Sequence, residues 1–338
     1  MLTELHALPE GFLEASAGGL HQVLPGPTLI HLPGRRGPAL FVSVLLHGNE
    51  DTGLRAMQSV LARYAPGTLP RALSLFVGNV AAAALGVRRL DDQPDYNRIW
   101  PGAPDTDREE HELARQVLQA MHERGVFASV DIHNNTGLNP HYACVSRTDR
   151  AFLHLATLFS RIVVHFRQPL GTQASAFARL CPAVTLECGK PGNAGSERHA
   201  ADFVDALLHL DHLPTHKVAR HDLDLYESVG LVRVADELEF GFGDERVPVA
   251  FLPDLDHLNF RDLPAGTRLA HLAPDVVQPL TVVAPDGTDV SAAWFAVREG
   301  QLVTRRPLMA AMLTLNRRVI RQDCLCYLMQ RIDPDRVL

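Results

Sequence analysis

The 338-residue sequence lacks the features that mark several common classes of protein. It has no excess of basic residues, since the net charge is −7, and this argues against broad binding of nucleic acids or anionic membranes, which requires a basic surface. No apolar run approaches the length needed to span a bilayer. The N-terminus has neither a basic segment nor a long apolar one, so we expect no signal peptide and a cytoplasmic location.

Cysteine is also scarce. There are five cysteines, an odd number, and none of them forms a C-x-x-C pair. We therefore expect reduced thiols rather than a disulfide framework. The hydrophobic content of 46% and the charged content of 21% are ordinary for a globular enzyme, and the length allows two domains. The oligomeric state is left open, a homo-oligomer included.

Short apolar segments alternate with helical patterns between residues 40 and 210. The predicted strands are 40–47, 73–79, 128–133, 142–146, 161–167 and 183–188. The predicted helices are 52–64, 107–124, 149–160 and 197–210, the second with an N-cap at Thr106 and Asp107. This alternation predicts an α/β domain, residues 1–214, whose largely parallel or mixed sheet is covered by helices on both faces.

The pattern changes after Pro214. The segments that follow are short, strand-like and separated by Gly, Pro and Asp, and they include 231–234, 267–272, 280–283, 294–297 and 324–329. Only residues 308–315 suggest a helix, of one or two turns. We predict a smaller β-rich C-terminal domain, residues 215–338.

Two of the apolar runs end in a histidine, and this is the most informative feature of the sequence. One ends in His47, with Glu50 three residues later, and the other ends in His133. Because ligands bind at the carboxyl ends of strands in open α/β sheets, these side chains are expected to meet. Two histidines and one carboxylate that leave a fourth position open are the pattern of a catalytic zinc site. Among seventeen histidines, either one alone is as well explained by an incidental turn.

Two carboxylates accompany this pattern. Asp131 lies two residues before His133, on the same face of its strand, and it suits either the second N–H of that imidazole or a salt bridge with a helix. Glu187 ends a third apolar run, where burial of a carboxylate is costly without a partner. It is either a general base beside the metal or the partner of Lys190.

Cationic residues supply the remaining candidates. Arg98 beside Asn97 suits bidentate capture of a substrate carboxylate. Arg88 and Arg89 offer a cation that polarises a scissile carbonyl, although a solvated surface pair is the commoner role of two adjacent arginines.

With these residues assembled, the chain resembles the succinylglutamate desuccinylase and aspartoacylase family, relatives of the zinc carboxypeptidases. The resemblance covers residues 40–210 well and the C-terminal part more loosely. Four blocks carry it in the family's order: His47-Gly-Asn-Glu50, Arg88 with Asp95-Tyr-Asn97-Arg98, Asp131-Ile-His133, and Pro182-Ala-Val-Thr-Leu-Glu187-Cys-Gly.

The resemblance implies a mixed-sheet, carboxypeptidase-like α/β domain followed by a small β domain. It also implies one zinc ion per chain on His47, Glu50 and His133. The implied catalytic base is Glu187 and the implied carbonyl polariser is Arg88, while Asn97 and Arg98 form a carboxylate clamp. The stretch after His133 departs from the family's Thr-rich pattern, because it reads Asn-Asn-Thr-Gly.

We therefore predict a zinc-dependent hydrolase that cleaves the amide bond of an N-acyl amino acid or a similar small amide bearing a carboxylate. One alternative is a zinc carboxypeptidase that acts on peptides. Another is a non-catalytic metal or ligand sensor on the same fold. The sequence leaves open the acyl group, the amino acid, the role of the C-terminal domain and the native metal if it is not zinc.

Overall fold

The computed structural model describes residues 1–104, 107–244 and 246–333 of the chain. These residues form two compact units. The first comprises Met1–Asn134 and His141–Leu225 together with Asp333, and the second comprises Asn135–Pro140 and Tyr226–Ile332.

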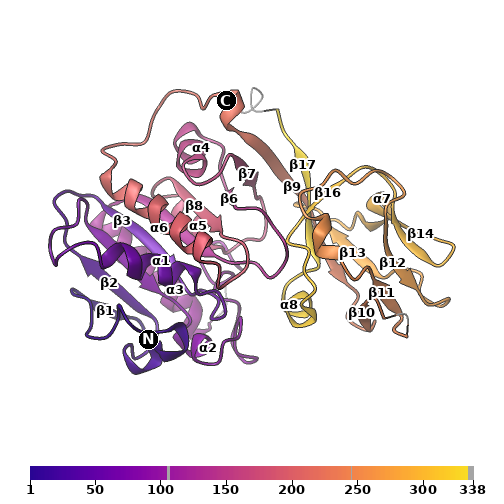
Figure 1. Cartoon of the computed structure of the whole chain (residues 1–338), viewed down its shortest axis with the longest axis horizontal. Helices are drawn as coiled ribbons and strands as arrows, with labels where there is room; N and C mark the ends of the chain where they lie inside the picture. Colours follow the sequence, from indigo (N-terminus) through magenta and orange to yellow (C-terminus); the bar gives the residue numbers. More distant parts are fainter. Residues whose placement is uncertain (105–106, 245, 334–338) are drawn as a thin grey trace. The chain divides into compact units, whose positions relative to one another are not determined.

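The first unit is built on a mixed sheet (Figure 1). Its strands lie in the order β1 (Thr3–Leu5), β2 (Thr28–Leu32), β4 (Leu73–Val77), β3 (Ala39–Val44), β5 (Val126–His133), β8 (Ala183–Glu187), β6 (Tyr142–Val145) and β7 (Ile162–His165). Strand β3 runs parallel to β4 and β5, and β5 runs parallel to β8, whereas β2 and β6 pair antiparallel with β4 and β8. The predicted mixed α/β fold is confirmed, and β1 and β2 are additions to the predicted strands.

The predicted helices are present with slightly different ends. They are α1 (Thr52–Leu61), α3 (Glu109–Arg124), α4 (Arg150–Thr157) and α6 (Ala194–His209), and the short helices α2 (Val80–Ala84) and α5 (Gln173–Phe177) were not predicted. Arg108 is the N-cap of α3, and three glutamates in its first turn complement the helix dipole. Of the predicted N-cap pair, Thr106 lies outside the described residues and Asp107 precedes the cap.

The two faces of the central strands differ in chemistry, because successive residues alternate between them. One face is apolar and packs against α1, where a Cβ on Gly53 would meet Val44 and Ile132 within 3.0 Å. The other face is polar although it is buried, and Phe177 of α5 stacks on Phe41 there. The polar residues of this second face that are register partners on β3, β5 and β8 or follow them in alternation are Ser43, Ser129, Asp131, His133, Thr185 and Glu187.

The second unit is β-rich, as predicted. Most of β9 (Asp224–Val234) belongs to this unit. Strands β13 (Leu280–Val283) and β17 (Cys326–Arg331) both pair antiparallel with β9. Strand β16 (Met309–Ala311) pairs antiparallel with β17. A five-stranded sheet contains β10 (Phe240–Phe242), β11 (Val249–Phe251), β12 (Arg268–Leu272), β15 (Gln301–Thr304) and β14 (Phe295–Arg298). Helices α7 (Ser291–Trp294) and α8 (Arg317–Gln322) are short.

The helical turns predicted for residues 308–315 are wrong. Met309–Ala311 form strand β16, and the helix α8 starts only at Arg317. All three strand residues are buried, and a short apolar run buried on both sides has no periodicity that separates a strand from a helix.

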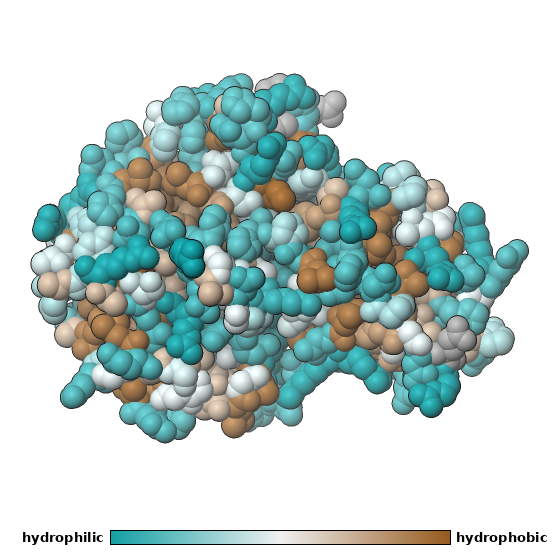
Figure 2. Space-filling view, in the orientation of Figure 1, coloured by the Kyte–Doolittle hydropathy of each residue, from teal (hydrophilic) through white to brown (hydrophobic). Residues whose placement is uncertain are grey.

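Three 3-10 helices complete the described elements: η1 (Ala17–Gln22) and η2 (Arg220–Asp222) in the first unit and η3 (Leu255–Leu258) in the second. No described helix is both long and apolar enough to cross a bilayer. On the face shown in Figure 2, hydrophilic residues predominate and apolar residues lie in small separate groups. The five cysteines are buried and free, and burial raises the pKa of the Cys181 thiol to about 12.

The turn between β3 and α1 carries two of the predicted metal ligands. Strand β3 ends at Val44, earlier than predicted, and Leu45 has a positive φ of 54°. The chain then passes close to α2, so that a Cβ on Gly48 would lie 2.2 Å from backbone atoms of Ala82 and Ala83. Glycine at position 48 therefore allows the close approach that fixes the path of this turn.

We predict that Gly48→Ala destabilises the protein, because the new Cβ would clash with backbone atoms of Ala82 and Ala83, which cannot move without shifting α2. Overpacking of this kind typically costs about 1–3 kcal/mol, which unfolding in denaturant measures directly. Gly26→Ala is the matched control, since a Cβ there meets no heavy atom within 4 Å. Equal free energies of unfolding for the two variants would contradict the prediction.

Candidate metal centre

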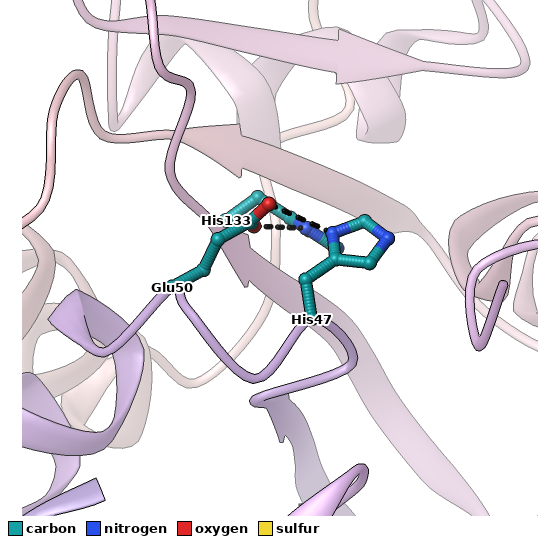
Figure 3. Close-up of side chains that lie close together, drawn as sticks. All are labelled: His47, Glu50 and His133. Atoms are coloured by element: carbon teal, nitrogen blue, oxygen red, sulfur yellow. Dashed lines mark hydrogen bonds and ion pairs between the residues drawn. The ribbon is translucent and has the colours of Figure 1, made fainter. Parts of the chain in front are cut away.

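The three predicted metal ligands meet in the first unit (Figure 3). His47 lies in the turn after β3, Glu50 lies just before α1, and His133 is the last residue of β5. Each of them offers one ligand atom, and these atoms lie within 4.8 Å of one another. All three residues are buried, with exposed fractions between 3% and 5%.

Both imidazoles turn Nδ1 toward Glu50 and Nε2 toward an aspartate. Nδ1 of His47 is 2.8 Å from Glu50 Oε1, and its Nε2 is 2.9 Å from Asp95 Oδ1. Nδ1 of His133 is 2.8 Å from Glu50 Oε2, and its Nε2 is 2.7 Å from Asp131 Oδ2. An aspartate that accepts the Nε2 proton leaves the lone pair of a neutral imidazole on Nδ1. Both lone pairs then face one carboxylate.

This arrangement fits a divalent metal ion. Nδ1 of His47 is buried and makes no hydrogen bond of acceptable geometry, although Glu50 is only 2.8 Å away. Lone pairs that face a carboxylate repel it unless positive charge lies between them. Two imidazole nitrogens and a carboxylate oxygen are a donor set that metals such as zinc prefer.

The electrostatics of the centre favour positive charge between Glu50 and the two histidine rings. Burial alone would raise the pKa of Glu50, but His47 and His133 outweigh it and hold that pKa well below its usual value. Burial opposes the charged form of His133, yet Asp131 and Glu50 raise its pKa well above its usual value. The pKa of His47 is raised too, because Glu50 and Asp95 outweigh burial and Arg88. Protons and a metal ion would therefore compete for the same nitrogens.

Arg88, and not Arg89, faces the centre. Its Nε and Nη2 donate to Asp95 Oδ2 at 3.2 and 2.8 Å, and its Nη1 donates to Glu50 Oε1 at 3.4 Å. Arg89 donates instead to backbone carbonyl groups of its own loop. Because the other oxygen of Asp95 accepts from His47, Asp95 links the guanidinium to a predicted metal ligand.

Glu187 lies next to His133 on the polar face of the sheet. The two residues are register partners on the parallel strands β8 and β5, which lie about 4.8 Å apart in any sheet. Glu187 is 6% exposed, whereas its alternative partner Lys190 is exposed. Burial and then the charges of Glu187 and Asp131 hold the pKa of the Cys144 thiol well above its usual value, which places both carboxylates in one environment.

Asn97 is buried within the centre. Its Nδ2 lies 3.4 Å from Asp131 Oδ2 and 3.2 Å from His133 Nε2, and its Oδ1 accepts the backbone N–H of Gln173 at 2.8 Å. Arg98 is half-buried and donates to the backbone carbonyl of Asn97 at 2.8 Å. The structure thus places Asn97 in the centre and the Arg98 guanidinium against the backbone of Asn97.

Arg98 also acts on the centre through its charge. Burial would raise the pKa of Asp95, but Arg88, His47 and then Arg98 hold it well below its usual value. Asp95 is therefore an ionised acceptor for the Nε2 proton of His47.

Two residues were not assigned a role from the sequence. Asp95 is part of a block that carries the family resemblance, but its contact with His47 depends on how the loop folds back. Asn134 donates its backbone N–H to Glu50 Oε2 at 3.0 Å. Its side chain binds both the backbone N–H and the hydroxyl of Thr52 and the carbonyl of Gly189, and it thereby holds the start of α1. The one sequence feature that could have identified Asn134 is its position directly after the predicted metal ligand His133.

The fold and the centre together define an α/β protein with a buried His–Glu–His site at the strand ends of a mixed sheet. Residues 36–210 match the model of the succinylglutamate desuccinylase/aspartoacylase catalytic domain. The chain belongs to the succinylglutamate desuccinylase/aspartoacylase family. A search of curated proteins found no match.

Solved structures of low sequence identity share the fold. Succinylglutamate desuccinylase from Chromobacterium violaceum is 19% identical, with a TM-score of 0.57 over 88% of this chain and 86% of that one. A succinylglutamate desuccinylase/aspartoacylase from Rhodobacter sphaeroides is 17% identical, with a TM-score of 0.57 over 89% and 88%. Murine aminoacylase 3 is 17% identical, with a TM-score of 0.54 over 88% and 97%.

We predict that His47→Ala lowers the affinity for a divalent metal ion by at least ~100-fold, since losing one direct ligand should cost at least as much as losing its outer-shell partner. Competition with a chromophoric chelator measures the affinity, which should weaken as the pH is lowered because protons displace the metal. His221→Ala, at an exposed histidine, is the control. Equal metal affinity in the two variants would remove His47 from the site.

Proposed function

We propose that the protein is a zinc-dependent hydrolase that cleaves the amide bond of an N-acyl amino acid or a similar small amide bearing a carboxylate. The observation that carries this proposal is the register of Glu187 with His133, which sets a buried carboxylate beside the His–Glu–His centre. Membership of the family supports it. We propose a cytoplasmic enzyme with small-molecule substrates and neither nucleic-acid nor membrane partners.

Zinc is the proposed metal, with one ion per chain. His47, Glu50 and His133 would hold it, and three protein ligands leave a position for water or substrate. A zinc ion bound in such a site lowers the pKa of water to about 7 and polarises a carbonyl group. The aspartates Asp95 and Asp131 would orient the two imidazoles through Nε2.

Glu187 is the proposed general base and acid. Its carboxylate accepts a proton from the attacking water and passes that proton to the amine nitrogen as the amide bond breaks. Arg88 is proposed to stabilise the negative charge that develops on the carbonyl oxygen. Its contacts with Asp95 and Glu50 hold the guanidinium at the centre before substrate arrives.

Arg98 and Asn97 are the proposed carboxylate clamp. A guanidinium pairs with a carboxylate through two parallel hydrogen bonds, which orients the substrate as well as binding it. Arg98 is half-buried and follows Asn97 directly in the chain, and its charge acts on Asp95 of the centre. Holding the remote carboxylate places the amide at the reacting groups and lowers the entropic cost of reaction.

We predict that Glu187→Gln lowers kcat by at least ~100-fold, the usual scale of a general acid–base contribution. The amide has the same shape but cannot take the proton, so the zinc content should not change. Elemental analysis and steady-state kinetics on a panel of N-acyl amino acids and short peptides provide the measurements. Unchanged turnover would exclude Glu187 as the base. Wild-type hydrolysis of the peptides alone would instead favour a carboxypeptidase, and zinc binding without any hydrolysis would favour a sensor.

We predict that Arg98→Ala raises KM about 10–100-fold for a substrate with a free carboxylate, since a hydrogen bond to a charged group contributes about 1.5–3 kcal/mol. The control is the same substrate with its carboxylate converted to a carboxamide. On that neutral substrate the variant and the wild type should differ little. An equal rise in KM for both substrates would show that Arg98 does not recognise the carboxylate.

A further inference from the structure

Asn97 contacts both aspartates that bind the predicted metal-ligating histidines. Its backbone N–H donates at 2.7 Å to Asp95 Oδ1, the atom that accepts from His47 Nε2. Its side-chain Nδ2 lies 3.4 Å from Asp131 Oδ2, the atom that accepts from His133 Nε2. One residue thus joins two aspartate–histidine pairs, of which Asp131 and His133 lie on β5 while Asp95 and His47 lie in loops.

The orientation of the Asn97 amide follows from its third contact. The backbone N–H of Gln173 lies 2.8 Å from Oδ1 of Asn97, and a backbone N–H can only donate. That atom is therefore the carbonyl oxygen, and the NH2 group faces Asp131 and His133. Gln173 is fully buried and its side chain donates to Ser129 Oγ at 2.7 Å, so the peptide that fixes Asn97 is itself held.

Of the two acceptors near the NH2 group, only Asp131 leaves His133 able to bind a metal through Nδ1. His133 Nε2 is 3.2 Å away, but a donation to it would require the ring proton on Nδ1, the nitrogen that faces Glu50. Donation to Asp131 leaves the proton of His133 on Nε2 and the lone pair on Nδ1. The Ser43 hydroxyl donates to the other oxygen of Asp131 at 2.7 Å, so that Asn97 and Ser43 hold this carboxylate from two sides.

We propose that Asn97 is a positioning residue of the metal centre, which acts through Asp95 and Asp131 and not only through contact with substrate. It holds both aspartates where they accept the Nε2 protons, and it thereby directs the Nδ1 atoms of both histidines to a single point. This inference rests on the proposed metal site but not on the proposed substrate.

The test compares Asn97→Ala and Asn97→Asp with His221→Ala, a variant of an exposed histidine outside the centre. Zinc affinity is measured by competition with a chromophoric chelator. Losing an outer-shell partner typically weakens metal binding about 10–100-fold, and we expect this for both Asn97 variants. Asn97→Asp keeps the backbone donor to Asp95 and an acceptor for Gln173, so it serves if the alanine variant does not fold. The zinc affinity of His221→Ala should be unchanged.

A spectroscopic measurement separates positioning from general damage. In the zinc-loaded wild type, NMR should show slowly exchanging ring protons on Nε2 of His47 and His133. In the Asn97 variants these protons should exchange faster with solvent, while the amide protons of the core strands keep their protection.

Three outcomes are decisive. If the wild type does not bind zinc, the proposed function and this inference both fail. If the wild type and both Asn97 variants bind zinc equally and keep the ring protons, while KM rises, then Asn97 is only a clamp and the inference alone is overturned. Weaker zinc binding and faster ring-proton exchange in the Asn97 variants, with His221→Ala unchanged, support the inference even where no substrate has been found.

Discussion

Each of the two carboxylate oxygens of Glu50 faces the Nδ1 atom of one buried histidine, His47 or His133. The rest of the centre is arranged around these two contacts. One oxygen also receives the Arg88 guanidinium and the other receives the backbone N–H of Asn134. Burying such groups together is costly unless positive charge lies among them. The fold therefore builds a place that requires protons or a metal ion.

The formal charges at the centre point the same way. Glu50, Asp95, Asp131 and Glu187 contribute four negative charges, and the guanidinium groups of Arg88 and Arg98 contribute two positive ones. With both imidazoles neutral, these groups carry a net charge of −2, which one divalent cation balances. The acidic residues that orient the histidines thus also prepare the site electrostatically for the ion.

Much of this was predictable, because strand ends and alternation are properties of local sequence. Apolar runs that end in His47, His133 and Glu187 identified the strands, and parallel register brought their ends together. The role of Asp95 was not predictable, since its contact with His47 spans a loop whose path no local pattern fixes. The strand at Met309–Ala311 was missed for a different reason, because burial on both sides leaves no periodicity to read.

Asn97 and Arg98 show why residue types in a motif do not determine roles. An amide beside a guanidinium suggests that both serve one substrate carboxylate, yet the two side chains have different surroundings. The amide is buried between the Asp131 carboxylate, the His133 imidazole and a peptide N–H, whereas the guanidinium is half-buried. Because the backbone N–H of Asn97 also reaches Asp95, the proposed recognition of a substrate carboxylate by Arg98 and the proposed orientation of both histidines depend on one short stretch of chain. If both proposals hold, a change in substrate specificity at this stretch is constrained by the metal site.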